Sequence, residues 1–335
     1  MKLQHYAGVD PAKLTFMIAV WPDGDHTQEE VREFSNTTSG YTQLGYWLKD
    51  LGVAPEALLC CVEHTGQYSL GLSFWLHEQG VLVWKEMPLV IKRSLGLVRG
   101  KSDRFDAQQI ARYCFTHQHE AQAWEPPSKS IQKLAAMIAQ RSRLIDTRTR
   151  LTVPIGELEQ TQAKQQAQLL STLCASTLKG IDKDLERIEA AIDELLAKDQ
   201  QLGDQYQLLC SVPGIGRVTA CLLIVHTRAF TRFEHPRQLA CYCGVAPFEH
   251  SSGTSIRGKT RVSHMANKTL KKAMHMAAVS VTRSKNDIAE YYHRKLAEGK
   301  NKMLVINAVR NKLLHVAMAV VQRGTPYQKV HPELA

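Results

Sequence analysis

Four carboxylates stand where the fold could bring them together to bind a metal ion. Asp10 ends a short apolar run, and Glu63 ends a longer one. Asp103 and Asp106 are three residues apart at the start of a helical pattern, so they share one helical face. Two Mg²⁺ ions about 3.5–4 Å apart can activate an attacking oxygen and stabilise a leaving one. Because Mg²⁺ prefers hard oxygen ligands and phosphate, the set predicts a magnesium site that acts on phosphate esters.

Each carboxylate also has a plain structural explanation. Asp10 precedes Pro11 and could simply end a strand, while Asp103 could cap a helix and Asp106 could favour its dipole. Glu63 is harder to explain in this way, because an acid that follows five apolar residues lies near a buried edge. Together the four residues favour the metal site.

Basic side chains surround these carboxylates in the sequence. Lys13 follows Asp10 by three residues, and Arg99, Lys101 and Arg104 flank the aspartate pair. A basic loop beside carboxylates suits a phosphodiester backbone, although a solvated charge cluster has the same appearance. Lys plus Arg is 42 and Asp plus Glu is 32, so the net charge is +10. This balance favours a polyanion partner, most simply nucleic acid, over a merely basic soluble enzyme.

The elements that must position the carboxylates alternate between strands and helices. Strands are predicted over His5–Val9, Thr15–Trp21, Val31–Ser35, Ala57–Val62 and Val81–Lys85, and helices over Thr42–Leu51 and Gly71–Glu78. Three strands followed by strand–helix alternation predict a mixed sheet flanked by helices. If the strands of Asp10 and Glu63 are neighbours, both side chains emerge at one edge of that sheet.

The segment from about Ser128 to Gln205 is rich in Gln, Ala, Leu, Lys and Arg. Its apolar residues recur at alternating steps of four and three, which predicts a coiled-coil seam: Ile181, Leu185, Ile188, Ile192 and Leu195. The sequence Val-Pro-Ile-Gly at 153–156 interrupts the helical pattern and favours a helical hairpin. A plain bundle helix buried in the same domain is an equal alternative. A protruding coiled coil would be a natural dimerisation device.

A second candidate site follows the helical segment. Pro213-Gly214-Ile215-Gly216 precedes a helical run at Val218–Val225 and resembles a helix-hairpin-helix, whose helix N-terminus offers free N–H groups to phosphate. An ordinary tight turn between packed helices is the alternative. Residues 250–259 form a polar, basic loop, and most such loops are ordinary surface connections. The alternative is that it places a hydroxyl nucleophile beside Arg257, Lys259 and Arg261. Further helices are predicted over Leu270–Val281 and Met303–Val321.

The bulk properties indicate a soluble, cytoplasmic protein. The 335 residues are enough for two or three domains. The N-terminal residues lack the apolar stretch of a signal peptide, and no run approaches the ~18 apolar residues that span a membrane. The 8 cysteines lie mostly in strand-like and helical patterns, as packed, reduced thiols do. Cys241 and Cys243 lack a second pair at zinc spacing.

The order of these motifs resembles one family. Three segments look like successive motifs of the DEDD-type insertion-sequence transposases, the "one-ten" family related to the Piv DNA invertases. They are Gly8-Val9-Asp10-Pro11-Ala12-Lys13, Val62-Glu63-His64-Thr65-Gly66 and Lys101-Ser102-Asp103-Arg104-Phe105-Asp106-Ala107. Ser102 stands where the family commonly has Thr. The Pro-Gly-Ile-Gly turn and the Ser-Gly-x-Ser-x-Arg-Gly pattern that begins at Ser252 resemble the family's C-terminal transposase domain. The resemblance covers nearly the whole chain.

The resemblance implies an α/β plus α architecture in three parts. Residues 1–127 are expected to form a RuvC-like, RNase H-like catalytic domain, 128–205 a coiled-coil helical and dimerisation region, and 206–335 a mainly helical transposase domain with a helix-hairpin-helix. It implies that Ser252 is the nucleophile, with Ser251 and Ser255 close by as alternatives. It also implies a dimer or tetramer, donor and target DNA as partners, and guidance by a structured bridge or seek RNA.

Three functions therefore compete. A site-specific transposase or recombinase would use Mg²⁺ at the four carboxylates and Ser252 to form a covalent phosphoserine link. A RuvC-like resolvase or nuclease would hydrolyse with water and need the carboxylates but not Ser252. A non-catalytic DNA-binding module would need neither.

Overall fold

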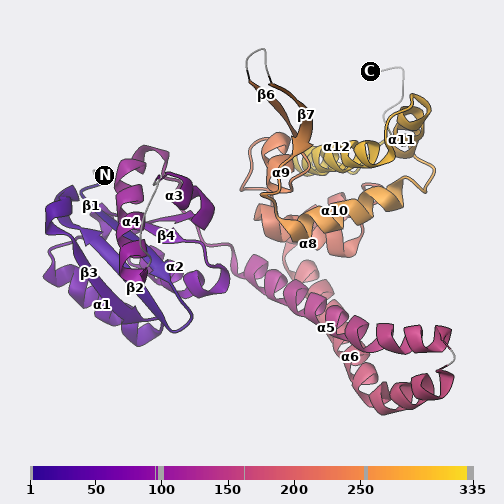
Figure 1. The fold of residues 1–335 in the computed structure, drawn as a ribbon, viewed down its shortest axis with the longest axis horizontal. Helices are drawn as coiled ribbons and strands as arrows, with labels where there is room; N and C mark the ends of the chain where they lie inside the picture. The colour runs from indigo at the N-terminus through magenta and orange to yellow at the C-terminus, as the bar shows by residue number, and fades with distance from the viewer. Residues whose placement is uncertain (1–2, 95, 97–101, 162, 253–255, 330–335) are drawn as a thin grey trace. The chain divides into compact units, whose positions relative to one another are not determined.

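The computed structural model describes residues 3–94, 96, 102–161, 163–252 and 256–329, with the backbone alone at 250–252, 256–257 and 259–260. The chain divides into two compact units, which we call the N-terminal unit, Met1–Pro126, and the C-terminal unit, Pro127–Ala335. Each unit has its own hydrophobic core. Figure 1 shows the ribbon of both units.

The N-terminal unit is built on a five-stranded sheet of order β3-β2-β1-β4-β5. β2 runs antiparallel to both β1 and β3, whereas β1, β4 and β5 are parallel. This mixed sheet confirms the predicted α/β class and is consistent with a RuvC-like domain. The strands are β1 (His5–Pro11), β2 (Thr15–Trp21), β3 (Glu30–Ser35), β4 (Leu58–Glu63) and β5 (Leu82–Glu86).

Helices cover both faces of this sheet. Helix α1 (Thr38–Asp50) and helix α2 (Leu70–Glu78) share one core cluster with the strand residues Val9, Cys60 and Val83. Helix α4 (Asp103–Thr116) packs on the opposite face. Because successive strand residues point to opposite faces, Asp10 and Glu63 lie on the α4 face. A shorter helix, α3 (Pro88–Ser94), follows β5.

The main chain of α4 runs unusually close to β1 at Gly8. A Cβ atom added at Gly8 would lie 2.0 Å from the nitrogen of Ala111 and 2.6 Å from the carbonyl oxygen of Ala107. Only glycine allows this approach. Gly8 and Asp10 are two residues apart on the same face of β1, so the approach also brings the start of α4 toward Asp10.

The C-terminal unit begins with a helical hairpin of α5 (Lys129–Gln160) and α6 (Lys164–Lys198). Arg141 pairs with Glu189 at 2.8 Å and Arg148 with Asp182 at 3.2 Å, a pairing order that makes the helices antiparallel. The seam residues Ile181, Leu185 and Ile192 are buried. A helical hairpin is therefore present, while the coiled-coil description stays a prediction.

The predicted interruption at 153–156 is wrong. Pro154 lies inside α5, and the two helices are separated near Thr161 and Ala163 instead. Proline removes one helical hydrogen bond and tends to bend a helix rather than always end it. Figure 1 shows α5 bending along its length.

The described residues of the C-terminal unit contain six further helices. They are α7 (Gln200–Cys210), α8 (Arg217–Thr227), α9 (Pro236–Tyr242), α10 (Lys268–Val281), α11 (Asp287–Ala297) and α12 (Lys302–Arg323). One core joins Leu134 of α5 and Ile192 of α6 to residues of all six helices. The segments expected to form separate domains at 128–205 and 206–335 therefore lie in one compact unit.

Helix α12 fills the centre of this core. Val309, Leu313 and Ala317 are fully buried along it. Among the described residues it is the one helix long and apolar enough to cross a membrane, with half of its apolar window buried. The core that it fills accounts for its apolar composition.

The polar segment at 250–259, expected to be a loop, is part of a β-hairpin. β6 (Pro247–Ser252) pairs antiparallel with β7 (Ile256–Val262). Its physical basis is visible in β7, where β-branched Ile256, Thr260 and Val262 alternate with basic residues. Because basic residues dominate this segment, its short alternation was not recognised as a strand pattern.

We predict that Gly8→Ala unfolds or strongly destabilises the N-terminal unit, by about 3 kcal/mol or more, because the clash is with main-chain atoms. Tryptophan fluorescence during urea unfolding measures this selectively, since all five tryptophans lie in that unit: Trp21, Trp47, Trp75, Trp84 and Trp124. The control is Gly45→Ala in α1, whose added Cβ would make an ordinary 3.4 Å contact. The control should be neutral or up to ~1 kcal/mol more stable. Equal midpoints for the two variants would contradict the close approach.

Candidate functional site

Asp10 and Glu63 come from adjacent parallel strands. The pairing of β1 with β4 ends at Val9 opposite Val62, so the next residue of each strand is the carboxylate. Both side chains are partly buried. The sequence prediction that they emerge at one edge of the sheet is confirmed by this register.

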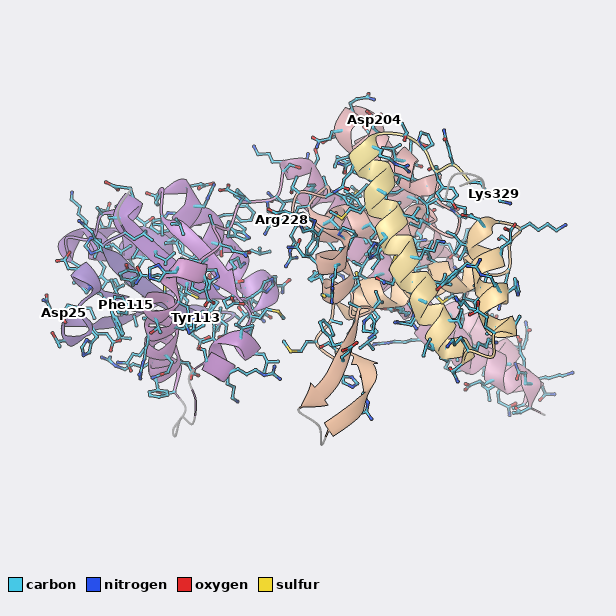
Figure 2. All side chains as sticks on the ribbon, turned by 90° about the horizontal axis from the view of Figure 1, so that it is seen from above. Asp25, Tyr113, Phe115, Asp204, Arg228 and Lys329 are labelled. Atoms are coloured by element: carbon cyan, nitrogen blue, oxygen red, sulfur yellow. The ribbon has the colours of Figure 1, made fainter. Side chains whose placement is uncertain are left out.

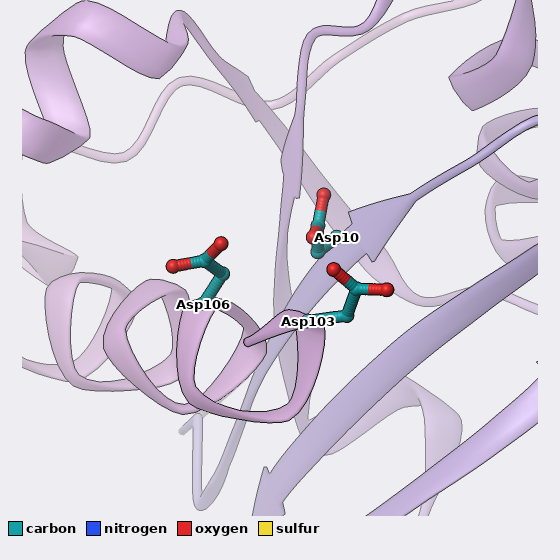
Figure 3. A group of neighbouring side chains, drawn as sticks. All are labelled: Asp10, Asp103 and Asp106. Carbon is teal, nitrogen blue, oxygen red and sulfur yellow. The ribbon is translucent and has the colours of Figure 1, made fainter. Parts of the chain in front are cut away.

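The other two carboxylates come from the first turn of α4. Ser102 caps this helix, and its side chain accepts a hydrogen bond from the Phe105 N–H at 3.2 Å. Ligand atoms of Asp10, Asp103 and Asp106 all lie within 4.8 Å of one another. Figure 3 shows Asp10 on its strand facing the two helix carboxylates.

Glu63 interacts directly with this group. Burial, the negative charge of Asp10, a hydrogen bond with Asp10 and the charge of Asp106 together raise the pKa of Glu63 to about 7. Like charges this close cannot all ionise freely in the absence of a cation. Glu63 therefore interacts with Asp10 and Asp106, and Asp103 joins the same cluster by its distance to those two residues.

This cluster has the chemistry of a divalent-cation site. All of its donors are hard carboxylate oxygens, and three separate elements supply them. Burial and the repulsion by Asp10 and Asp106 raise the pKa of Glu63, and a bound cation would offset that repulsion. Asp103 is exposed, which leaves room for water or a substrate phosphate beside the cluster.

A fifth carboxylate, which the sequence analysis did not identify, lies at the same end of the parallel strands. Glu86 ends β5 and pairs in register with Glu63. Its carboxylate accepts hydrogen bonds from the Met87 N–H at 2.6 Å and from the Tyr113 hydroxyl of α4 at 3.4 Å. Glu86 also ends a strand, but it follows Lys85 instead of an unbroken apolar run, so its sequence signal is weaker than that of Glu63. The hydrogen bond from Tyr113 links Glu86 of β5 to helix α4.

Two of the four basic residues predicted to bind nucleic acid near the cluster are among the described residues. Lys13 is exposed in the turn between β1 and β2, and Arg104 is exposed on the first turn of α4. Arg99 and Lys101 lie outside the described residues. Lys13 and Arg104 therefore lie close to the carboxylates in the sequence, and both side chains are exposed to solvent.

The Pro-Gly-Ile-Gly sequence joins α7 to α8 through a tight turn. Gly214 has a φ of +86°, and Val212 and Ile215 are buried on either side of it. Gly216 is the N-cap of α8 and provides no side-chain cap, so it leaves the first N–H groups of that helix without a side-chain acceptor at the cap. Two helices and a glycine turn fit the predicted motif, while its binding role stays a prediction.

Ser252 is the last residue of β6. Its backbone pairs with Ile256, and Ser251 pairs with Arg257 across the hairpin. Lys259 and Arg261 also lie on β7, and Arg261 is exposed. Ser255 lies outside the described residues. The hairpin belongs to the C-terminal unit, whereas the carboxylates belong to the N-terminal unit.

A mixed sheet with a carboxylate cluster at the ends of β1 and β4, followed by a mainly helical unit, is consistent with a DEDD-type DNA-rearranging enzyme. A DEDD transposase model matches residues 7–158, and the model described as "Transposase IS116/IS110/IS902 family" matches residues 206–293. The chain belongs to the IS110 family of insertion-sequence transposases.

Named relatives agree with this assignment. The chain is 27% identical to the pilin gene-inverting protein of Moraxella bovis over 97% of this chain and 98% of that protein. It is 26% identical to the transposase of insertion sequence element IS1111A from Coxiella burnetii, over 68% of each chain. DNA is accordingly its substrate.

The raised pKa of Glu63 predicts a pH-dependent stability. Its folded-state pKa of about 7 lies above the ordinary value of 4.5, so the folded protein binds the extra proton between these values. Stability of the metal-free protein therefore falls as pH rises through this window. Glu63→Gln should raise the melting midpoint at pH 8 and change it less at pH 5, as measured by tryptophan fluorescence.

The matched control is Glu56→Gln, which removes an exposed carboxylate in the same unit. It should leave the midpoint unchanged at both pH values. Adding Mg²⁺ at pH 8 should stabilise the unaltered protein more than Glu63→Gln. A Glu63→Gln protein that is equally destabilised at pH 5 and pH 8 would rule out the repulsion of Glu63 by Asp10 and Asp106.

Proposed function

We propose that this transposase cleaves and exchanges DNA strands through a covalent phosphoserine intermediate, with Mg²⁺ at Asp10, Glu63, Asp103 and Asp106. The single observation that carries the proposal is the convergence of these carboxylates from β1, β4 and α4. Family membership and the position of Ser252 at the end of β6 support it further. The two groups of residues divide the chemistry between them.

The proposed reaction has two transfers. The Ser252 hydroxyl attacks a DNA phosphodiester, forming a P–Oγ bond while the P–O3′ bond breaks. The serine proton is transferred overall to the leaving 3′ oxygen, which becomes a 3′-hydroxyl. A 3′-hydroxyl from another strand then attacks the phosphoserine, restores a phosphodiester and returns the proton to Ser252. No water is consumed, so the bond energy is conserved for rejoining.

The chain's own residues have distinct roles in this scheme. Bound Mg²⁺ would supply Lewis-acid polarisation of the phosphate and charge stabilisation at the departing oxygen. The four carboxylates would hold the Mg²⁺ ion in place. Arg257, Lys259 and Arg261 of β7 lie on the strand paired with that of Ser252, where they would bind the phosphate and its developing charge.

Other groups would hold the DNA backbone. Lys13, Arg99, Lys101 and Arg104 would contact phosphates beside the carboxylates. The turn at Gly214 and Gly216 would bring a phosphate to the N-terminus of α8, where unbonded N–H groups and the helix dipole favour an anion. These contacts position the backbone without selecting a base sequence.

The proposed assembly is a dimer or tetramer with composite sites, in which one protomer supplies carboxylates and another supplies Ser252. The separation of the two groups into different compact units supports this arrangement. The proposed guide is a bridge or seek RNA that pairs with donor and target DNA. The net charge of +10 is compatible with an RNA partner.

A hydrolytic resolvase or nuclease is the second candidate. It is favoured by one observation: the carboxylate cluster lies within the N-terminal unit alone. Such an enzyme would activate water at the cluster and would not require the β6–β7 hairpin.

The serine mechanism predicts that Ser252→Ala abolishes recombination, with a loss of at least about 10³-fold. Labelled junction DNA incubated with Mg²⁺ and resolved on a denaturing gel should show a protein–DNA adduct for the unaltered protein and none for Ser252→Ala. Ser251→Ala and Ser255→Ala are the matched controls and should retain the adduct. Recombination by Ser252→Ala would eliminate the serine mechanism.

The metal mechanism predicts that Asp103→Ala lowers cleavage by about 10²–10³-fold, because one ligand and one charge are lost. EDTA should stop the unaltered protein, and added Mg²⁺ should restore it. The control is Asp50→Ala, which removes a carboxylate at the exposed end of α1. Cleavage that survives Asp103→Ala and EDTA would exclude the metal site.

A further inference from the structure

The two ends of the segment that contains Ser252 are held side by side. This segment runs between Tyr242, the last residue of α9, and Asn267, the N-cap of α10. The Asn267 N–H donates to the Tyr242 carbonyl oxygen at 2.8 Å. A Cβ atom added at Gly244 would lie 2.3 Å from the Cβ of Ala266, so the chain ends also touch just inside this pair.

Side chains reinforce this closure. The Asn267 amide donates to the Tyr242 hydroxyl at 2.9 Å and lies 3.2 Å from Nδ1 of His226. The Tyr242 hydroxyl lies 3.4 Å from the same nitrogen. Burial and the nearby charge of Arg232 lower the pKa of His226, so its ring is neutral near pH 7 and Nδ1 can accept. Asn267 also accepts from the Leu270 N–H at 2.8 Å, which caps α10.

Arg232 covers the outside of this group. Its guanidinium carbon lies 4.5 Å from the centre of the Tyr242 ring and 5.3 Å from that of Phe233. The contact is a cation–π interaction, which fixes the plane of the tyrosine ring. Tyr242 is therefore held at its backbone, its hydroxyl and its ring face.

The chain reaches Arg232 through a strained turn. Arg228, Ala229 and Phe230 follow α8 with φ values of 52°, 53° and 63°, a left-handed conformation that non-glycine residues rarely adopt. The turn is held by the Ala229 N–H on the Ile224 carbonyl at 2.8 Å and by the Phe230 N–H on the Thr227 hydroxyl at 3.0 Å. Figure 2 labels Arg228 within this unit. Strained residues persist where the surroundings over-determine them, which is typical of functional regions.

We propose that Tyr242, Asn267, His226 and Arg232 form a polar lock that positions the β6–β7 hairpin for strand cleavage. Tyr242 and Asn267 are positioning residues, which act on the reaction through the hairpin and not by touching DNA. The inference rests on the proposed role of Ser252. The lock connects the end of α8 and the loop after it with both ends of the serine segment, so its geometry sets where the hairpin projects from the helical unit.

Two conservative variants test the lock in the full-length protein. Tyr242→Phe removes only the hydroxyl, and Asn267→Ser keeps an oxygen that caps α10 while removing the amide donor. Hydrogen exchange followed by mass spectrometry should show β6 and β7 amides exchanging at least about tenfold faster in both variants, with α5 and α6 unchanged. The rate of adduct formation at saturating DNA should fall at least about tenfold, while the DNA concentration for half-maximal rate stays within about twofold.

The matched control is Tyr327→Phe, which removes a tyrosine hydroxyl that donates to Asp287 elsewhere in the same unit. It should leave hairpin exchange and adduct formation unchanged. Faster hairpin exchange without loss of adduct rate, or loss of rate without faster exchange, overturns the positioning role. An adduct that persists in Ser252→Ala refutes the proposed nucleophile separately, and the exchange measurement still decides whether the lock holds the hairpin.

Discussion

The N-terminal unit depends on one steric constraint, the approach of the α4 main chain to β1 at Gly8. Two residues farther along the same face, β1 ends in Asp10, and α4 begins with Asp103 and Asp106. A helix lying farther from the sheet would move its aspartates away from Asp10, because a side chain as short as aspartate cannot bridge an added layer of packing. The carboxylate cluster therefore requires glycine at position 8, because only glycine lets α4 approach β1 this closely.

The sheet and the cluster could be predicted because their signals are local. Apolar runs that end in an acid mark strands whose ends meet, and the three-residue spacing of Asp103 and Asp106 sets them on one helical face. Pro154 misled the prediction because a proline in a long helix bends it where packing on both sides continues. Glu86 gives a weaker signal than Glu63, because Lys85 interrupts the apolar run before it.

The serine segment was harder to predict for a different physical reason. Its strands are short and polar, so their alternation carries little hydrophobic contrast, and both strands of the pair are needed before either is stable. His226, Tyr242 and Asn267 are separated widely in the sequence, and nothing in their types distinguishes them from ordinary helix-end residues. Contacts of this kind become visible only when the helices that carry them are placed together, as α8, α9 and α10 are here.

Joining Tyr242 to Asn267 has a consequence for which changes of length this chain can tolerate. Both ends of the intervening segment are fixed to the same helices, and its first residues, Cys243, Val245 and Ala246, are buried in the core. Only the part beyond Ala246 can therefore change in length without moving that core. The entropy of closing such a loop grows only with the logarithm of its length, so lengthening costs little stability: a doubling costs about 0.6 kcal/mol. A protein engineer could lengthen the hairpin beyond Ala246, provided that Ser252 and the basic residues of β7 are kept.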